Sequence, residues 1–158
     1  MNTKKPLILL DLEQTVIPSW NDRWVDPHAI TKILATVAHQ RITDFSLGLM
    51  SWAVWHEADL EVFREDLQKP LEDALGAPFE LVWGMPQWAE EVFLTTRRKV
   101  SIHDLFDMMG KHEVLMACRS SPKLQRTVLF FDDTAHHGLR LTDPNTGLDF
   151  QFINIDKV

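Results

Sequence analysis

Two carboxylates, Asp11 and Glu13, follow a short unbroken apolar run, Leu-Ile-Leu-Leu at residues 7–10. This run is too short for a typical helix and suits a strand that is buried on both faces. Strands of that kind belong to parallel sheets covered by helices, and ligands of open α/β sheets bind at the carboxyl ends of the strands. The two acids are therefore candidates for a site where carboxylates bind a cation or react directly. The alternative is that they are ordinary turn residues.

A second acidic pair repeats this arrangement far downstream. Asp132 and Asp133 follow the apolar stretch Thr-Val-Leu-Phe-Phe at residues 127–131. A third strand-like stretch, residues 42–50, ends at Ser51. If the three strands are parallel neighbours, these oxygen-bearing side chains meet at one edge of the sheet. The repetition favours a functional site over a pair of unrelated turns.

The hydrophobic pattern predicts the elements that hold these residues in place. Strands are expected at residues 7–10, 42–50, 79–83, 127–131 and 148–156. Helices are expected at residues 27–40, 57–75, 101–109 and 112–119, the second of them interrupted near Pro70 and ended by Gly76. Asp26 and Pro27 are expected as the N-cap and first residue of the first helix. Residues 84–93 are expected to form a turn and then a short helix or an irregular segment.

Strands and helices alternate along the chain, which predicts an α/β fold. We expect a single Rossmann-like domain over residues 1–158, with a mainly parallel sheet flanked by helices. The 158 residues are 45% hydrophobic and 25% charged, which is ordinary composition for one globular domain.

The charge and the cysteine count limit the function classes. The net charge of −7 disfavours broad nonspecific binding to nucleic acid or to an acidic membrane surface. The only cysteine, Cys118, excludes an internal disulfide and any multi-cysteine zinc site, and it is a weak candidate for a nucleophile. The apolar run at residues 7–10 is too short for a signal sequence or a membrane span. We therefore expect a cytoplasmic protein without a membrane partner.

The order of these residues resembles the four motifs of the haloacid dehalogenase (HAD) superfamily of phosphotransferases. Those motifs are a strand followed by Asp-x-Asp-x-Thr, a strand ending in Ser or Thr, a lysine near a helix start, and a strand ending in acids. Here they correspond to Asp11-Leu-Glu13-Gln-Thr15, Ser51, a lysine, and Asp132-Asp133. The resemblance spans most of the chain, and its first and last motifs together are fairly specific.

Within that superfamily, the segments around Asp11 and around Asp132-Asp133 look like the small capless magnesium-dependent phosphatases. The segments between the motifs are mostly needed for scaffold helices, so no large cap domain is expected. The resemblance implies hydrolysis of phosphomonoesters through an aspartyl-phosphate on Asp11. It also implies Mg²⁺ held by Asp11, the backbone carbonyl of Glu13, and Asp132, with Asp133 nearby. The substrate would be a phosphorylated small molecule or a phosphoprotein.

Two further roles follow from the resemblance. Ser51 would donate its hydroxyl group to a phosphate oxygen, although a serine that only caps the next helix is an equal alternative. Lys111 would neutralise Asp11 and the transferred phosphoryl group, because it precedes Asp132 by 21 positions and stands one helix ahead of that strand. Lys99 and Lys123 are the competing candidates for this lysine.

Glu13 departs from the family pattern, which has aspartate as the general acid and base at this position. Its carboxyl group stands on a stem that is longer by one methylene, and a displacement of about 1 Å can cost on the order of 10²-fold in rate. A slow phosphatase, a phosphotransferase that holds its intermediate, and an inactive relative that serves as a binding platform all remain open. A receiver-type domain fits less well, because its acidic pair precedes its phosphoacceptor.

Several other residues have both a functional and a simple structural interpretation. Trp20 and Trp24 lie in a loop beside Asp11, where they could contact a substrate, whereas Trp52 and Trp55 are expected in the core. The pair His136-His137 follows the late acids, but it lacks partners at metal-ligand spacing and is expected in a loop.

Overall fold

The structure is a computed structural model, which describes residues 4–134, 137–142 and 148–158. The strands are β1 (Leu7–Leu10), β2 (Ser46–Leu49), β3 (Phe79–Leu81), β4 (Val128–Asp132), β5 (Leu139–Thr142) and β6 (Asp149–Asn154). The helices are α1 (Pro27–His39), α2 (Glu57–Phe63), α3 (Lys69–Leu75), α4 (Met85–Thr96), α5 (Ile102–Asp107) and α6 (Lys111–Ala117). A π-helical turn, η1 (Arg64–Gln68), joins α2 to α3, and the 3-10 turns η2 (Pro122–Leu124) and η3 (Ile155–Lys157) complete the elements.

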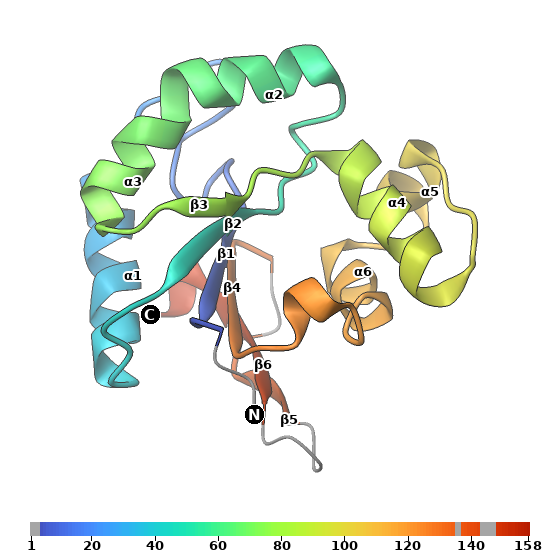
Figure 1. Cartoon of the computed structure of the whole chain (residues 1–158). Helices are drawn as coiled ribbons and strands as arrows, with labels where there is room; N and C mark the ends of the chain where they lie inside the picture. Colours follow the sequence, from blue (N-terminus) through green and yellow to red (C-terminus); the bar gives the residue numbers. More distant parts are fainter. Residues whose placement is uncertain (1–3, 135–136, 143–147) are drawn as a thin grey trace.

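One six-stranded sheet runs through the centre of the domain (Figure 1), in the order β3-β2-β1-β4-β6-β5. All neighbouring strands are parallel except β5, which pairs with β6 in the antiparallel direction. The first strand of the chain therefore lies between β2 and β4, at the middle of the sheet. The predicted α/β fold with a mainly parallel sheet is confirmed, and the described residues hold no cap domain.

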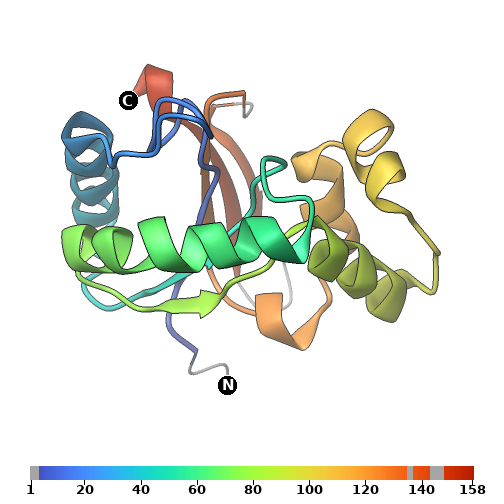
Figure 2. The same ribbon diagram turned by 90° about the horizontal axis from the view of Figure 1, so that it is seen from above.

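Helices cover both faces of the sheet, with α1 on one side and α4–α6 on the other (Figure 2). The buried side chains of α1, α2 and α3 pack in one cluster with Ile8, Leu10 and Phe131. Those of α4, α5 and α6 pack in a second cluster with Leu7 and Phe130. Successive side chains of a strand point to opposite faces, so β1 is apolar on both sides because both faces are covered. Within the described residues, no helix has the length and apolar character needed to cross a membrane.

The helix starts and stops follow local chemistry. Asp26 caps α1 by accepting the backbone N–H of His28 at 2.9 Å, with Pro27 as the first helical residue, as predicted. The expected interruption near Pro70 takes the form of η1, which directly precedes it. Proline has no N–H to donate to the carbonyl four residues earlier, and a π-helical turn accommodates such a local change. Gly76 ends α3 with a positive φ of 72°, the left-handed conformation that favours glycine.

The structure corrects three of the predicted elements and adds a strand that was not predicted. β2 begins only at Ser46, not at residue 42, and β3 ends at Leu81, not at residue 83. Residues 85–96 form a regular helix, α4, because Pro86 lies in its first turn and so starts the helix instead of breaking it. The strand β5, four residues long at the sheet edge, was not predicted.

The amino ends of the two central strands hold an ion pair between a buried arginine and an exposed glutamate. Arg126, two residues before β4, is 1% exposed and donates from Nη2 to Glu80 Oε1 at 3.1 Å. Its Nε donates to the carbonyl of Lys5, just before β1, at 2.6 Å. Arg126 thus joins the starts of β1 and β4 to β3, and its charge is neutralised inside the protein.

Candidate functional site

The sheet register brings the two predicted acidic ends together. Leu10 of β1 pairs with Phe131 of β4, so Asp11 and Asp132 follow at the same level on neighbouring parallel strands. The backbone N–H of Asp11 donates to the carbonyl of Phe131 at 3.0 Å, which fixes this alignment one residue beyond β1. Both carboxyl side chains are buried, at the carboxyl edge of the sheet.

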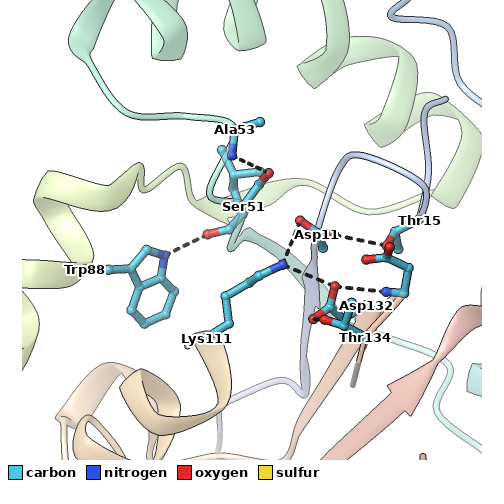
Figure 3. Close-up of polar contacts among 10 residues, drawn as sticks. Asp11, Thr15, Ser51, Ala53, Trp88, Lys111, Asp132 and Thr134 are labelled. Carbon is cyan, nitrogen blue, oxygen red and sulfur yellow. Dashed lines mark hydrogen bonds and ion pairs between the residues drawn. The ribbon is translucent and has the colours of Figure 1, made fainter. Parts of the chain in front are cut away.

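Lys111 links these two carboxylates (Figure 3). Its Nζ lies 3.2 Å from Asp11 Oδ1 and 3.2 Å from Asp132 Oδ1. The side chain comes from the first residue of α6 and is 16% exposed, so the ion pairs are largely shielded from solvent. Of the three lysines considered from the sequence, Lys111 is therefore the one that the fold places against Asp11.

The other two lysines lie elsewhere. Lys123 holds its ammonium group 4.8 Å from the centre of the Trp83 ring, a cation–π contact. Lys99 is exposed in the segment between α4 and α5.

Three carboxylates form a compact oxygen cluster at this edge. Asp11, Asp132 and Asp133 each offer one oxygen, and these oxygens lie within 4.8 Å of one another. Nearby hydroxyl groups orient the acids, since Thr15 donates to Asp11 Oδ2 at 3.2 Å and Thr134 donates to Asp132 Oδ2 at 3.0 Å. A hard divalent cation prefers such oxygen ligands, so the donor set fits a metal such as Mg²⁺.

The cluster shifts the protonation of its members. Desolvation, partly offset by Lys111 and reinforced by Asp132, raises the pKa of Asp11 to about 8. Desolvation also acts on Asp132, but Lys111 and hydrogen bonds outweigh it, so the pKa of Asp132 lies below its usual range. Burial alone would lower the pKa of Lys111, yet the charges of Asp11 and Asp132 raise it. The ammonium group of Lys111 therefore stays charged, whereas the carboxyl group of Asp11 ionises only at a higher pH than usual.

A cavity of about 330 Å³ opens onto this cluster. Asp11, Asp133, Lys111 and Ser51 all line it, so residues from three predicted motifs and the predicted lysine share one space. Ser51 is buried, and its Oγ accepts the backbone N–H of Ala53 at 3.2 Å. The serine does not cap the next helix, because α2 begins at Glu57 with His56 as its N-cap. Its hydroxyl group makes a local turn contact instead, and Ser51 also lines the cavity.

Glu13 lines the same cavity but stands outside the carboxylate cluster. Its Oε2 accepts the backbone N–H of Trp20 at 2.9 Å. Gln14, the next residue, has a φ of 59°, which a residue other than glycine adopts only at some cost. The chain thus turns sharply after Glu13, and the loop that follows holds its side chain.

The aromatic residues at the cavity differ from those expected. Trp52 and Phe106 line it, whereas Trp20 and Trp24 are absent from its described lining. The Trp20 ring instead stacks under the guanidinium group of Arg23, 5.2 Å away. Trp52 directly follows Ser51, and this adjacency in the sequence could have indicated that Trp52 lies beside the cavity. Phe106 had no such signal, because only the packing of α5 brings it here.

His137 and Cys118 are not among the described residues that line this cavity. His137 accepts the backbone N–H of Asn154 at its Nδ1, 3.3 Å away, and His136 lies outside the described residues. Cys118 is buried, and desolvation together with the charge of Glu91 raises its pKa to about 12, which disfavours a thiolate nucleophile.

The chain was compared with known proteins at the level of both sequence and structure. No family model matches it, and neither a curated protein nor a solved structure matches it. The molecule is thus a mainly parallel α/β domain with a buried cluster of aspartates at the carboxyl edge of its sheet.

Proposed function

We propose that this protein is a Mg²⁺-dependent phosphomonoester hydrolase of the HAD type, with Asp11 as the nucleophile. The observation that carries the proposal is the contact of Lys111 with both Asp11 and Asp132, at the ends of two neighbouring parallel strands. A carboxylate nucleophile beside a fixed cationic side chain suits transfer of a negatively charged phosphoryl group.

The metal would be held by Asp11, Asp132 and Asp133, whose oxygens already lie within reach of one ion. The backbone carbonyl of Glu13 remains a further proposed ligand. When bound, Mg²⁺ would screen the repulsion between these acids and the incoming phosphate. Binding a cation also favours the ionised form of Asp11, which its burial otherwise disfavours.

The chain's own residues would carry out two displacements. In the first, a carboxylate oxygen of Asp11 forms a bond to phosphorus while the bond from phosphorus to the leaving oxygen breaks, and that oxygen takes a proton from Glu13. In the second, water attacks the phosphorus, Glu13 takes a proton from the water, and the bond to Asp11 breaks to release inorganic phosphate. Lys111 and Ser51 would bind the phosphoryl oxygens throughout.

One observation favours a second candidate function, a weakened relative that binds phosphorylated partners without efficient turnover. The Glu13 carboxylate is held by the N–H of Trp20, and a proton carrier must move freely enough to reach the leaving group. The two candidates share the metal and phosphate site, and they differ only in the chemistry at Glu13.

Metal-dependent turnover of a broad phosphomonoester panel tests the proposal. Protein stripped with EDTA and then supplied with Mg²⁺ should release phosphate, and Asp11→Asn should abolish the release. Asp73→Asn, which changes an exposed acid on α3, serves as the matched control and should keep full activity. Activity without Mg²⁺, or activity that survives Asp11→Asn, would contradict the mechanism.

Glu13→Asp separates the two candidates. A large gain in turnover would identify the wild-type protein as a weakened relative, because the substitution shortens the stem and releases the contact with Trp20. Unchanged or reduced turnover would identify Glu13 as a competent acid and base.

A further inference from the structure

A second cavity adjoins the one at the carboxylates. It has a volume of about 200 Å³ and shares three walls with its neighbour, namely Trp52, Phe106 and Lys111. Asp132 and Thr134 also line it, so it begins directly beside the acids. A molecule whose phosphate group lies against Lys111 would have this second space within reach.

Aromatic rings make up most of its apolar lining. Phe130 and Phe152, from adjacent strands β4 and β6, contribute two rings 6.4 Å apart in an edge-to-face arrangement. The His112 ring lies 4.5 Å from that of Phe152. Aromatic walls of this kind favour flat ring systems, which gain offset or edge-to-face contacts beyond simple burial. An apolar cavity of about 150 Å³ holds benzene, so the space admits a six-membered ring.

The wall shared by the two cavities carries an aromatic side chain with exposed surface. Phe106 is 54% exposed, although it is a large apolar residue. The Trp55 ring packs against it with centroids 5.2 Å apart and an angle of 59°, so Phe106 is supported on its protein side. A flat ligand ring would cover exposed apolar surface at little ordering cost, because the supporting contact is already made.

Trp52 adds a polar group to this wall. Its indole Nε1–H is buried and has no hydrogen-bond partner among the described residues. An unsatisfied buried donor is unfavourable. Rotating the indole toward a ligand acceptor would therefore break no hydrogen bond that the described residues make.

We propose that the second cavity binds a planar aromatic ring, so that the preferred substrate is a phosphomonoester whose organic part carries such a ring. This inference rests on the proposed function for the phosphate end of the ligand. The ring could be attached directly to the phosphate, as in an aryl phosphate, or through a sugar, as in a nucleoside monophosphate. The shared requirement is one flat ring next to the phosphoryl group.

Binding of non-hydrolysable phosphonates in the presence of Mg²⁺ tests the proposal without requiring turnover. The three probes are phenylphosphonate, the methylene phosphonate analogue of adenosine monophosphate, and methylphosphonate, measured by isothermal titration calorimetry. We expect at least one ring-bearing probe to bind about tenfold more tightly than methylphosphonate, and the stronger of the two identifies how the ring is attached.

Phe106→Leu should remove most of that tenfold preference, measured within the variant as the ratio of the affinities for the ring-bearing probe and for methylphosphonate. Because Phe106 is half exposed, this variant should fold. Phe93→Leu alters another exposed phenylalanine outside both cavities and should change nothing.

The results that would contradict the ring site differ from those that would contradict the phosphatase activity. Equal affinity for all three probes, or a ring preference that survives Phe106→Leu, overturns the ring site even if phosphomonoesters are hydrolysed. A ring preference that depends on Phe106, combined with no Mg²⁺-dependent turnover of any phosphomonoester, supports the ring site and overturns the phosphatase.

Discussion

Buried charges gather at both ends of the central strands β1 and β4, and the two groups are built differently. At the amino ends, one arginine meets one glutamate and one backbone carbonyl. At the carboxyl ends, three aspartates cluster beside an open cavity, and Lys111 contacts two of them, Asp11 and Asp132. The charges of Arg126 and Glu80 cancel at the amino ends. At the carboxyl ends, three acids outnumber one lysine.

This difference separates a structural ion pair from a candidate site. Arg126 is satisfied by groups of its own chain, so its contacts can stabilise the fold but leave nothing for a ligand. Burial of the aspartate cluster raises the pKa of Asp11, and repulsion from Asp132 adds to this effect. Burying these aspartates together does not stabilise the fold. The same aspartates and Lys111 would, however, bind a cation and a phosphoryl group.

The largest expected contrast between the two groups is in activity. Under the proposed function, Lys111→Met should lower kcat by roughly 10²- to 10³-fold, since it removes a fixed charge that would face the transferred phosphoryl group. Glu80→Gln, at the opposite end of the strands, should change kcat by less than about twofold when measured at a temperature where it is folded. Equal losses of kcat in Lys111→Met and Glu80→Gln would contradict the distinction between the two charged groups.

Mg²⁺ should bind at the aspartates of the carboxyl ends and not at the ion pair of the amino ends. At a concentration about 100 times the dissociation constant, Mg²⁺ should stabilise the protein by about 2.7 kcal/mol, or about 5–10 °C in Tm. Differential scanning fluorimetry should show this shift in the wild type and in Glu80→Gln. Asp132→Asn removes a proposed ligand and should lose it, and a full shift in that variant would argue against a metal at the aspartates.

Breaking the amino-end pair should cost stability directly. Glu80→Ala leaves the buried Arg126 without its partner, and we expect a loss of about 2 kcal/mol in urea unfolding. This is below the roughly 3–5 kcal/mol for a fully buried pair, because the Glu80 side chain is 43% exposed and water can partly replace it. Asp44→Ala breaks the exposed pair with Lys5 nearby and should cost about 0.5 kcal/mol or less.

The pH dependence of stability should have opposite signs at the two ends. The folded-state pKa of Asp11 lies above its unfolded value, so ionised Asp11 destabilises the metal-free protein. Asp11→Asn should therefore gain stability relative to the wild type as the pH rises from about 4 to about 8. Urea titrations in EDTA at several pH values measure this difference, and a variant that is less stable at pH 8 would contradict it.

Glu80 provides the opposite case. The hydrogen bond from Arg126, opposed by desolvation, holds the pKa of Glu80 below its usual range. Its contribution is fully present above the unfolded value and is lost as the pH falls through the folded one. The difference between the wild type and Glu80→Gln should therefore shrink below about pH 4.5, and a difference that grows in acid would contradict this assignment.

The strands that carry the site could be predicted from the sequence because the hydrophobic pattern of a buried strand involves only a few neighbouring residues. An apolar run buried on both faces, as at residues 7–10, predicts its own position and the acid that follows it. The edge strand β5 alternates between half-buried and exposed residues within a segment rich in turn formers, so its pattern was too weak. β2 was drawn too long, because strand-forming residues before Ser46 find no partner in the sheet.

The candidate site was partly readable for the same reason. Asp11, Ser51 and Asp132 stand at or just past strand ends, and parallel neighbours must bring such ends together. Trp52 and Phe106 were missed, since their place beside the acids depends on how the loop after β2 and the helix α5 pack over the sheet.

The sequence by itself determined the layered α/β architecture and the order of acids along it, because burial and strand periodicity act over a few neighbouring residues. Only the tertiary structure decided which lysine meets Asp11, where the Glu13 side chain is held, and which aromatic rings line the cavities. Those contacts join segments many residues apart, and their geometry follows from the packing of helices on the sheet, which no short stretch of sequence encodes.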